Sequence, residues 1–209
     1  MNFFFLYIMI SFFSQNARGL PTEIKMRGIL GNKANVLFLQ ETKWDCGSMI
    51  KVKSLWRGPV FYNNGQGLAG GVAILVREGV FDEINCLYKD DEGRLLVVEG
   101  LKGDRRYRLI NIYAPNKVME RKRVFGEVGR WCNNETIMMG DFNVILTSDD
   151  VSGASRFFPD SSRSLIFKLL KEKNMEPCVD PIPMMNSHPR YAVLGVCREK
   201  GGDRAAESL

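Results

Sequence analysis

The chain has 209 residues, of which 45% are hydrophobic, a size and composition typical of one globular domain rather than a disordered chain. Lys and Arg outnumber Asp and Glu by 29 to 24, which gives a net charge of +5 and a sequence pI of about 9.0. This excess modestly favours a polyanionic partner such as nucleic acid, and a solvated basic surface is an almost equal alternative. Five cysteines without CxxC spacing argue against a disulfide framework or a zinc site, so we expect an intracellular protein, nuclear or cytoplasmic rather than secreted.

Residues 1–13 form an apolar start that we treat as a segment apart. The run from Phe3 to Phe13 would make a helix only about 16 Å long against a hydrocarbon core of about 30 Å, so we expect no stable membrane span. A signal peptide is disfavoured because no Lys or Arg precedes the run and no small-x-small cleavage site follows it. A third interpretation concerns the gene: residues 12–15 can be encoded by a pyrimidine tract ending in CAG, and translated intron would then replace the true first strand.

From Gly19 onward, short apolar runs alternate with polar or glycine-rich breaks, which predicts a succession of helices and strands. A helix is expected over 22–30, with Gly31-Asn32 as its stop. The connection 63–71 contains four glycines and is expected to form a tight hairpin or a mobile loop. Strands rich in branched residues are expected at 36–39, 70–76, 95–99, 107–113 and 136–139. These elements predict an α+β domain.

Two later helices are predicted from apolar periodicity. One lies within 116–132, with Asn116 as its cap and Arg121 among the charged residues of a solvated face that can contact phosphates. Its apolar face carries Val118, Phe125, Val128 and Cys132. The other is expected to begin near Asp160 or Ser161 as its cap. The side chains that it turns inward are Leu165, Ile166, Leu169 and Leu170.

Two buried strands end in polar side chains that we expect to share one site. In Gly140-Asp141-Phe142-Asn143, which follows an apolar run, Asp141 and Asn143 are two residues apart and project to the same side. The segment 35–43 has the same build and presents Glu41 after its apolar run. Each pattern is weak alone, because Gly-Asp is common in turns and Asp-x-Asn is common where strands end. Two such ends in one chain indicate one site for a metal or a phosphate.

Four segments of this chain carry a family resemblance. They are Ser14-Gln15-Asn16-Ala17-Arg18-Gly19-Leu20, Leu39-Gln40-Glu41-Thr42-Lys43, Asn111-Ile112-Tyr113-Ala114-Pro115-Asn116 and Met139-Gly140-Asp141-Phe142-Asn143. In this order the chain resembles the endonuclease/exonuclease/phosphatase superfamily, specifically the apurinic-like endonuclease domain of LINE-type retrotransposons. The resemblance covers residues 14–180 and implies a four-layer α/β-sandwich of the DNase I-like type, two packed mixed sheets flanked by helices, incomplete at its C-terminus. Residues 181–209 show little periodicity and are expected to form an irregular tail.

The resemblance implies hydrolysis of phosphodiester bonds in DNA, or in RNA, with Mg²⁺ or Mn²⁺ as cofactor. Such hard cations prefer oxygen ligands and retain several waters, so one or two carboxylates plus a substrate phosphate suffice. Glu41 is the candidate metal ligand, assisted by the amide oxygen of Asn16. Arg18 lies inside the first motif and is expected to contact nucleic acid, whereas Lys43 is expected to be a solvated charge.

The remaining roles concern the reaction itself. By the resemblance, Asp141 takes a proton from the in-line water or orients it, and Asn143 holds either Asp141 or the phosphate. Tyr113 would direct its hydroxyl at a non-bridging oxygen, where charge develops. A half-buried strand aromatic is an equally good interpretation of Tyr113.

The chain also departs from the family, which completes its site with a later aspartate and a terminal Ser-Asp-His. Its single histidine, His188, stands between Ser187 and Pro189 with no acid beside it, and Gln15 stands where the family commonly has tryptophan. We therefore expect a truncated domain with impaired cleavage. The main alternative is an inactive retrotransposon-derived remnant that binds nucleic acid weakly; a secreted or phosphoinositide-directed relative is a more distant one.

Overall fold

Alternation of side chains along the strands gives each sheet an apolar face, and the chain builds two such sheets and packs them together. The computed structural model describes residues 10–19, 23–65, 70–133, 135–144, 160–173 and 175. Sheet one has the strand order β1-β2-β4-β3 and sheet two the order β5-β6-β7-β8. The strands of sheet one are β1 (Phe12–Asn16), β2 (Val36–Gln40), β3 (Val60–Asn63) and β4 (Val72–Val76). Those of sheet two are β5 (Glu83–Lys89), β6 (Leu95–Lys102), β7 (Arg105–Tyr113) and β8 (Thr136–Asp141).

Both sheets are mixed. Strand β1 runs parallel to β2, and β7 runs parallel to β8, while the other neighbouring strands are antiparallel. A parallel pair needs a crossover connection, and helices supply it. The crossover from β1 to β2 contains α1 (Glu23–Leu30), and that from β7 to β8 contains α3 (Val118–Val128) and the 3₁₀ turn η1 (Gly129–Trp131).

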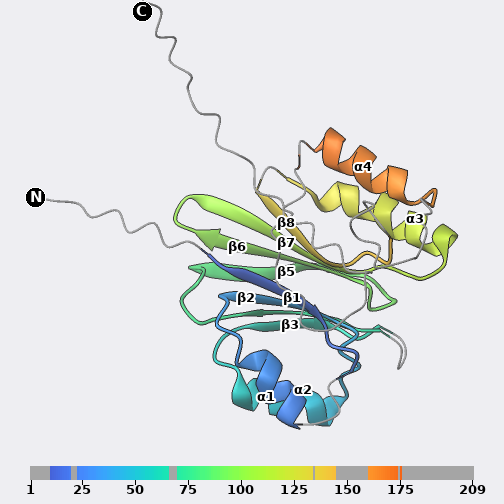
Figure 1. Ribbon diagram of the computed structural model, residues 1–209. Helices are drawn as coiled ribbons and strands as arrows, with labels where there is room; N and C mark the ends of the chain where they lie inside the picture. The colour runs from blue at the N-terminus through green and yellow to red at the C-terminus, as the bar shows by residue number, and fades with distance from the viewer. Residues whose placement is uncertain are drawn as a thin grey trace, which may run out of the picture.

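The helices cover the outer faces of the two sheets (Figure 1). Helices α1 and α2 (Cys46–Leu55) pack on sheet one, and α3 and α4 (Arg163–Glu172) pack on sheet two. The order helices, sheet, sheet, helices makes four layers, and the predicted α+β sandwich is confirmed. No helix in the described part of the chain has the length and apolarity that crossing a membrane requires.

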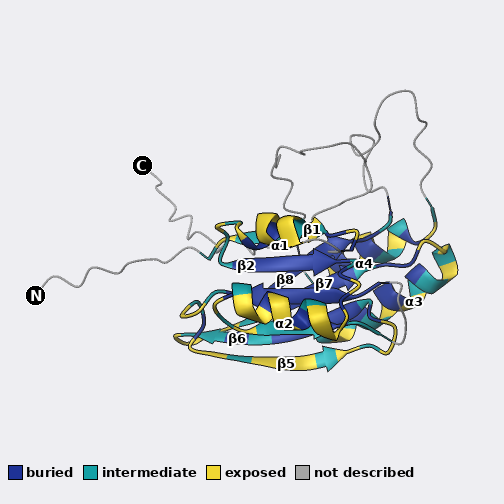
Figure 2. Ribbon diagram, turned by 90° about the horizontal axis from the view of Figure 1, so that it is seen from below, coloured by how far each residue is buried: buried dark blue, intermediate teal, exposed yellow. Residues whose placement is uncertain are grey.

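Neighbouring residues of one strand belong to different apolar layers. Val36 and Phe38 of β2 face sheet two, whereas Leu37 and Leu39 face the helices, and all four are fully buried. Strand β6 alternates in the same way between the inter-sheet layer and the layer under α3 and α4. Figure 2 shows the result, with the central strands buried and β5 mostly exposed at one edge. Strands buried on both faces explain the continuous apolar runs in the sequence.

Four elements were absent from the sequence prediction: β1, α2, β3 and β5. Helix α2 buries only Met49 and Val52 among its ten residues, so it leaves a weak periodic pattern. It begins at Asp45, whose carboxylate accepts a hydrogen bond of 2.7 Å from the Ser48 backbone N–H. Strands β3 and β5 lie at sheet edges, where exposure on one side dilutes the apolar signal. The first strand begins at Phe12, inside the apolar start, and pairs with β2 along its whole length.

Two predicted helix starts also need correction. Helix α3 has Lys117 as its N-cap residue, so Asn116 is not the cap. Helix α4 has Ser162 as its N-cap residue, one or two positions later than predicted. Its predicted apolar face is confirmed, because Ile166, Leu169 and Leu170 are buried. His188 and the expected tail 181–209 lie outside the described residues.

Arg121 was predicted to lie on a solvated face, and this prediction is wrong. Its side chain is only 4% exposed and its guanidinium donates four hydrogen bonds. The acceptors are the Ser162 hydroxyl, the Asp160 carboxylate at 2.6 Å and the carbonyls of Pro115 and Asn116. A buried charge requires such partners, and here they tie the start of α3 to the start of α4.

We expect Arg121→Met to lower the free energy of unfolding by about 3 kcal/mol, because it removes the donor for a carboxylate and two carbonyls. Urea denaturation measures the change. Arg123→Met is the matched control on the same helix: this side chain is 66% exposed, so the change should stay within about 0.5 kcal/mol. Equal losses in the two variants would contradict the structural role of Arg121.

The same contacts make stability sensitive to acid. Burial by itself would raise the pKa of Asp160, but hydrogen bonds from Ser162 and the nearby Arg121 hold this pKa below its usual value. A depressed folded-state pKa stabilises the protein above the unfolded value of about 3.9, and this contribution is lost as pH falls through the folded value. The stability difference between wild type and Asp160→Asn should therefore shrink as pH is lowered from about 5 to about 2. A difference that stays constant over this range would contradict the assignment.

Candidate active site

The carboxyl ends of four strands meet at one end of the sandwich. Parallel pairing brings together the ends of β1 and β2 and those of β7 and β8, and the hydrogen bond from Asn16 to Asp141 shows that the two pairs meet. Asn16 is the last residue of β1, and Glu41 follows the last residue of β2. Tyr113 and Asp141 end β7 and β8 and are directly paired across that ladder. Sheet one therefore supplies an amide and a carboxylate, and sheet two supplies a phenol and a carboxylate.

The side-chain amide of Asn16 joins the two carboxylates. Its Nδ2 donates to Glu41 Oε1 at 2.7 Å and to Asp141 Oδ2 at 2.9 Å. Its Oδ1 accepts a hydrogen bond of 2.9 Å from the backbone N–H of Arg18. Residues 125 positions apart in the sequence thus lie in direct contact, and Asn16 links the two strand ends that carry Glu41 and Asp141.

Tyr113 completes this group. Burial of the ring, the negative charges of Glu41 and Asp141 and a hydrogen bond to Glu41 raise the pKa of the Tyr113 hydroxyl well above its ordinary value. The guanidinium of Arg94, 5.2 Å from the ring centre, opposes this shift. The hydroxyl therefore keeps its proton at neutral pH and can act as a hydrogen-bond donor.

Asn143 and Ala114 fix the position of Asp141, which is only 3% exposed. The backbone N–H of Asn143 donates to Asp141 Oδ1 at 3.1 Å, and the N–H of Ala114 donates to the Asp141 carbonyl at 2.7 Å. The Asn143 side chain turns back and donates to the Ala114 carbonyl at 2.7 Å. In this structure Asn143 holds the loop around Asp141.

Gly140 is required by a close approach of two backbones. It lies inside β8 rather than after it, with φ of +150°, and a Cβ atom there would lie 2.0 Å from the carbonyl oxygen of Ile112. Glu41 also has a positive φ, +49°, in the turn after β2. That turn is held by backbone hydrogen bonds from Thr42 and Lys43 to the carbonyls of Gly71 and Gly70. Glu41 itself and the residue before Asp141 therefore both have a positive φ, and contacts with neighbouring backbone hold these conformations.

Comparison with known proteins identifies the family. Residues 14–193 match the Endonuclease/Exonuclease/phosphatase family. The chain belongs to this family. A transposon protein of Xenopus laevis, the Transposon TX1 uncharacterized 149 kDa protein, is 30% identical over 141 residues. That match covers 65% of this chain but only 11% of the Xenopus protein.

Solved structures share the fold. The endonuclease domain of TRAS1, a telomere-specific non-LTR retrotransposon, matches with a TM-score of 0.56 and 17% identity, over 88% of this chain and 81% of that domain. The AP endonuclease LMAP of Leishmania major matches with a TM-score of 0.58 and 16% identity, over 79% of this chain and 66% of its own. An AP endonuclease of Archaeoglobus fulgidus matches with a TM-score of 0.57 and 20% identity, over 78% of this chain and 69% of its own. The predicted resemblance to LINE-type endonuclease domains is confirmed.

Family members generally depend on a divalent metal, and the donor atoms at this site suit a hard one. The atoms available as ligands are all oxygens: the carboxylate oxygens of Glu41 and Asp141 and the amide oxygen of Asn16. Among the described residues, no three or more His, Cys, Asp or Glu side chains gather in a cluster suited to a metal. Asn16 presents its amide nitrogen to the carboxylates, so the expected role of its oxygen as a ligand requires the amide to turn.

Other predicted site residues lie at the edge of this group. Lys43, expected to be a solvated charge, is 45% exposed and lies 3.6 Å from Glu41 Oε2. Arg18 places its backbone N–H on Asn16 and has a φ of +47°. Arg94 was not predicted as a site residue. The only feature of the sequence that points to it is its position just before the predicted strand 95–99. Gln40 and Asn111, which form a buried amide pair beneath the site, were not predicted either.

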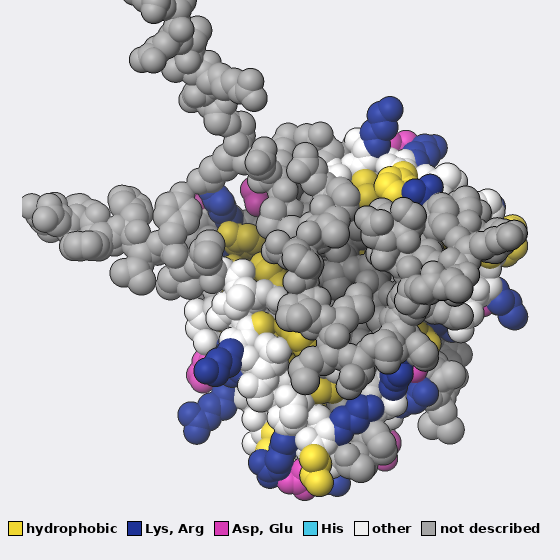
Figure 3. All heavy atoms as spheres, viewed as in Figure 1, with side chains coloured by type: hydrophobic (Ala, Val, Ile, Leu, Met, Phe, Trp, Pro, Cys, Tyr) yellow, Lys and Arg dark blue, Asp and Glu magenta, His cyan; other side chains and the backbone are white. Residues whose placement is uncertain are grey.

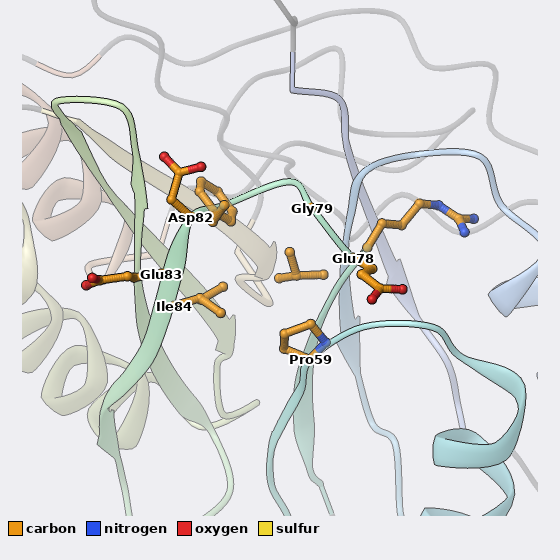
Figure 4. A pocket seen from close by; sticks show the side chains of 9 residues that line it. Pro59, Glu78, Gly79, Asp82, Glu83 and Ile84 are labelled. Atoms are coloured by element: carbon orange, nitrogen blue, oxygen red, sulfur yellow. The ribbon is translucent and has the colours of Figure 1, made fainter.

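A hollow lies at the opposite end of the sandwich. It has a volume of about 220 Å³ and includes the end of β4 and the start of β5. Val76 at the end of β4 pairs with Val36 at the start of β2, a whole strand away from Glu41. Figure 4 shows Pro59 and Ile84 facing the hollow while the carboxylates of Asp82 and Glu83 point away from it. This hollow is separate from the candidate active site.

We expect Gly140→Ala to lower the free energy of unfolding by about 3 kcal/mol or more, because the methyl group meets the Ile112 backbone and the positive φ becomes strained. Gly126→Ala is the matched control. Gly126 lies in α3, and nothing lies within 4 Å of the place that an alanine methyl group would take, so the same change should raise stability by about 0.5–1 kcal/mol. Thermal denaturation of both variants checks the contrast, and tolerance of Gly140→Ala would contradict the close approach.

Proposed function

We propose that this chain hydrolyses phosphodiester bonds in DNA with Mg²⁺ or Mn²⁺, as an endonuclease that nicks one strand. The observation that carries the proposal is the amide of Asn16 in contact with Glu41 and Asp141, next to the hydroxyl of Tyr113. One end of the sandwich thus holds oxygen ligands for a hard cation, a buried carboxylate and a hydroxyl donor. These are the groups that hydrolysis of a phosphodiester needs.

Each residue has a role in this proposal. Glu41 and Asn16 hold the cation, which when bound neutralises charge on the phosphate and polarises its oxygens. Asp141, kept in place by the backbone N–H of Asn143, orients the attacking water and accepts its proton. Tyr113 donates its hydroxyl hydrogen to a non-bridging oxygen, where charge develops.

DNA is the proposed substrate for two reasons. The family neighbours of known structure include two AP endonucleases and a retrotransposon endonuclease domain. The net charge of +5 favours a polyanion. Figure 3 shows Lys and Arg side chains spread around the edge of one face of the described surface, several with Asp or Glu beside them. This spread favours weak backbone contacts over tight, sequence-specific binding.

A second candidate function is binding of nucleic acid without cleavage. The observation that favours it is the setting of His188, the single histidine, which lacks the neighbouring acid that the family places in its terminal motif. Loss of that phosphate-side group would remove stabilisation of the transition state while leaving the Asn16, Glu41 and Asp141 group in place.

Nicking of supercoiled plasmid in the presence of Mg²⁺ distinguishes the two functions. We expect the wild-type chain to produce open circles and Asp141→Asn to reduce the rate on the order of 10²–10⁴-fold, because it removes the proton acceptor. Tyr113→Phe should reduce the rate on the order of 10²-fold through loss of one donor. The control is Asp82→Asn, which removes a carboxylate at the far end of the sandwich and should leave the rate unchanged. No nicking by the wild-type chain under these conditions would leave the second candidate function.

Binding of Mn²⁺, followed by electron paramagnetic resonance of the free ion, tests the metal ligands without DNA. We expect Glu41→Gln to weaken Mn²⁺ binding at least about tenfold, since a neutral amide replaces the carboxylate. Glu99→Gln is the control: this carboxylate pairs with Arg106 and Arg108 within sheet two, away from the site. Equal Mn²⁺ affinity in wild type and Glu41→Gln would contradict the proposed ligand.

A further inference from the structure

The candidate active site is divided between two sheets, so its geometry depends on how the sheets lie against each other. Asn16 and Glu41 belong to sheet one, and Tyr113 and Asp141 to sheet two. The layer between the sheets is mainly apolar. Apolar contacts are non-directional, and by themselves they do not fix how far one sheet slides along the other. Directional contacts in this layer add a preferred position to that packing.

Two fully buried amides provide such contacts directly beneath the site. Gln40 of β2 is 1% exposed and Asn111 of β7 is 0% exposed. Gln40 Nε2 donates to Asn111 Oδ1 at 2.8 Å and to the Ser14 hydroxyl at 3.2 Å. Asn111 Nδ2 donates to the carbonyls of Leu39 at 3.0 Å and Ala73 at 2.8 Å. Asn111 therefore binds two adjacent strands of the opposite sheet.

Both amides are coupled to site residues through the backbone. Gln40 immediately precedes Glu41 and pairs in register with Asn16. Asn111 lies two residues before Tyr113 on the same strand, so both side chains point into the layer between the sheets. A shift at either amide is passed to the site within one or two residues.

Besides the contacts of the site residues themselves, Asn63 makes a buried side-chain contact between the sheets. Asn63 of β3 lies at the same end of sheet one as Gln40 but two strands away, and it donates to the Leu95 carbonyl and to Asp90 ahead of β6. Strands β3 and β6 carry none of the four site residues. The Gln40 and Asn111 pair is thus the buried contact that joins the two strands adjacent to the site.

We infer that Gln40 and Asn111 are positioning residues, whose amide pair sets the alignment of the sheets at which Asn16 reaches both Glu41 and Asp141. The inference rests on the proposed function for its consequence in catalysis, but the alignment exists without metal or DNA. A misplacement of about 1 Å between catalytic groups is enough to reduce a rate on the order of 10²-fold. Holding this alignment would therefore explain why an amide pair is buried in a mainly apolar layer.

The first measurement uses neither metal nor DNA. The side-chain NH₂ of Asn16, assigned by its loss in Asn16→Leu, gives a ¹⁵N–¹H signal that reports contact with Glu41 and Asp141. In the wild type we expect slow exchange with solvent. In Gln40→Leu/Asn111→Leu, which replaces both partners with apolar groups, we expect a changed chemical shift and at least about tenfold faster exchange. Gln40→Met, which removes only the donor, should shift the signal in the same direction by less and keeps the test available if the double variant does not fold.

The control must separate alignment from general loss of stability. Ile110 lies next to Asn111 on β7, but its side chain faces the helix layer. Ile110→Val removes one buried methyl group there. It should lower the melting temperature and leave the Asn16 signal unchanged. If the amide variants and Ile110→Val alter the Asn16 signal only in proportion to their loss of stability, or if the signal does not change, the positioning role is overturned.

Nicking then tests the consequence separately. In the amide variants we expect a fall in kcat on the order of 10²-fold with little change in KM for DNA. A wild-type chain that does not nick plasmid would contradict the proposed function, while the Asn16 signal would still decide the positioning role. A changed Asn16 signal with unchanged kcat would restrict the pair to structure and overturn its role in the reaction.

Discussion

Two carboxylates that repel each other lie on either side of one amide group, and each comes from a different sheet. Asn16 donates to Glu41 and to Asp141 with two N–H groups of the same nitrogen, so the carboxylates stay close only while both sheets keep their alignment. In our proposal, residues outside the site therefore control its geometry. The buried pair of Gln40 and Asn111 controls the alignment from within the layer between the sheets.

Parallel pairing determines where this group can form. Because β1 is parallel to β2 and β7 to β8, each sheet presents two carboxyl ends side by side, and the packing of the sheets brings both pairs to the same end of the sandwich. The turns that follow β2 and β8 are constrained, because Glu41 and Asn143 have positive φ angles and hydrogen bonds hold both turns. Thr42 and Lys43, just after Glu41, donate to the carbonyls of Gly71 and Gly70, and the Asn143 N–H donates to Asp141 Oδ1. Gly140 permits β8 to approach the Ile112 backbone closely just before Asp141. Backbone strain next to Glu41 and Asp141 is maintained by the rest of the fold.

Local patterns in the sequence predicted the strands buried on both faces and the helices with clear apolar stripes. They failed for α2, which buries two side chains, and for β3 and β5, which lie at sheet edges. Arg121 was misassigned because periodicity treats a charged residue on a helix as exposed. Its burial depends on Asp160 and Ser162, which lie 39 and 41 positions away in the sequence.

The sequence by itself determined the family, the fold class and four of the side chains that gather at one end of the sandwich: Asn16, Glu41, Tyr113 and Asp141. These follow from motifs and strand ends, which are properties of short segments. Only the tertiary structure decided that the Asn16 nitrogen faces both carboxylates, and that Gln40 and Asn111 bind each other beneath them. The physical reason is that a buried polar side chain is defined by its hydrogen-bond partners, and these partners come from strands far apart along the chain.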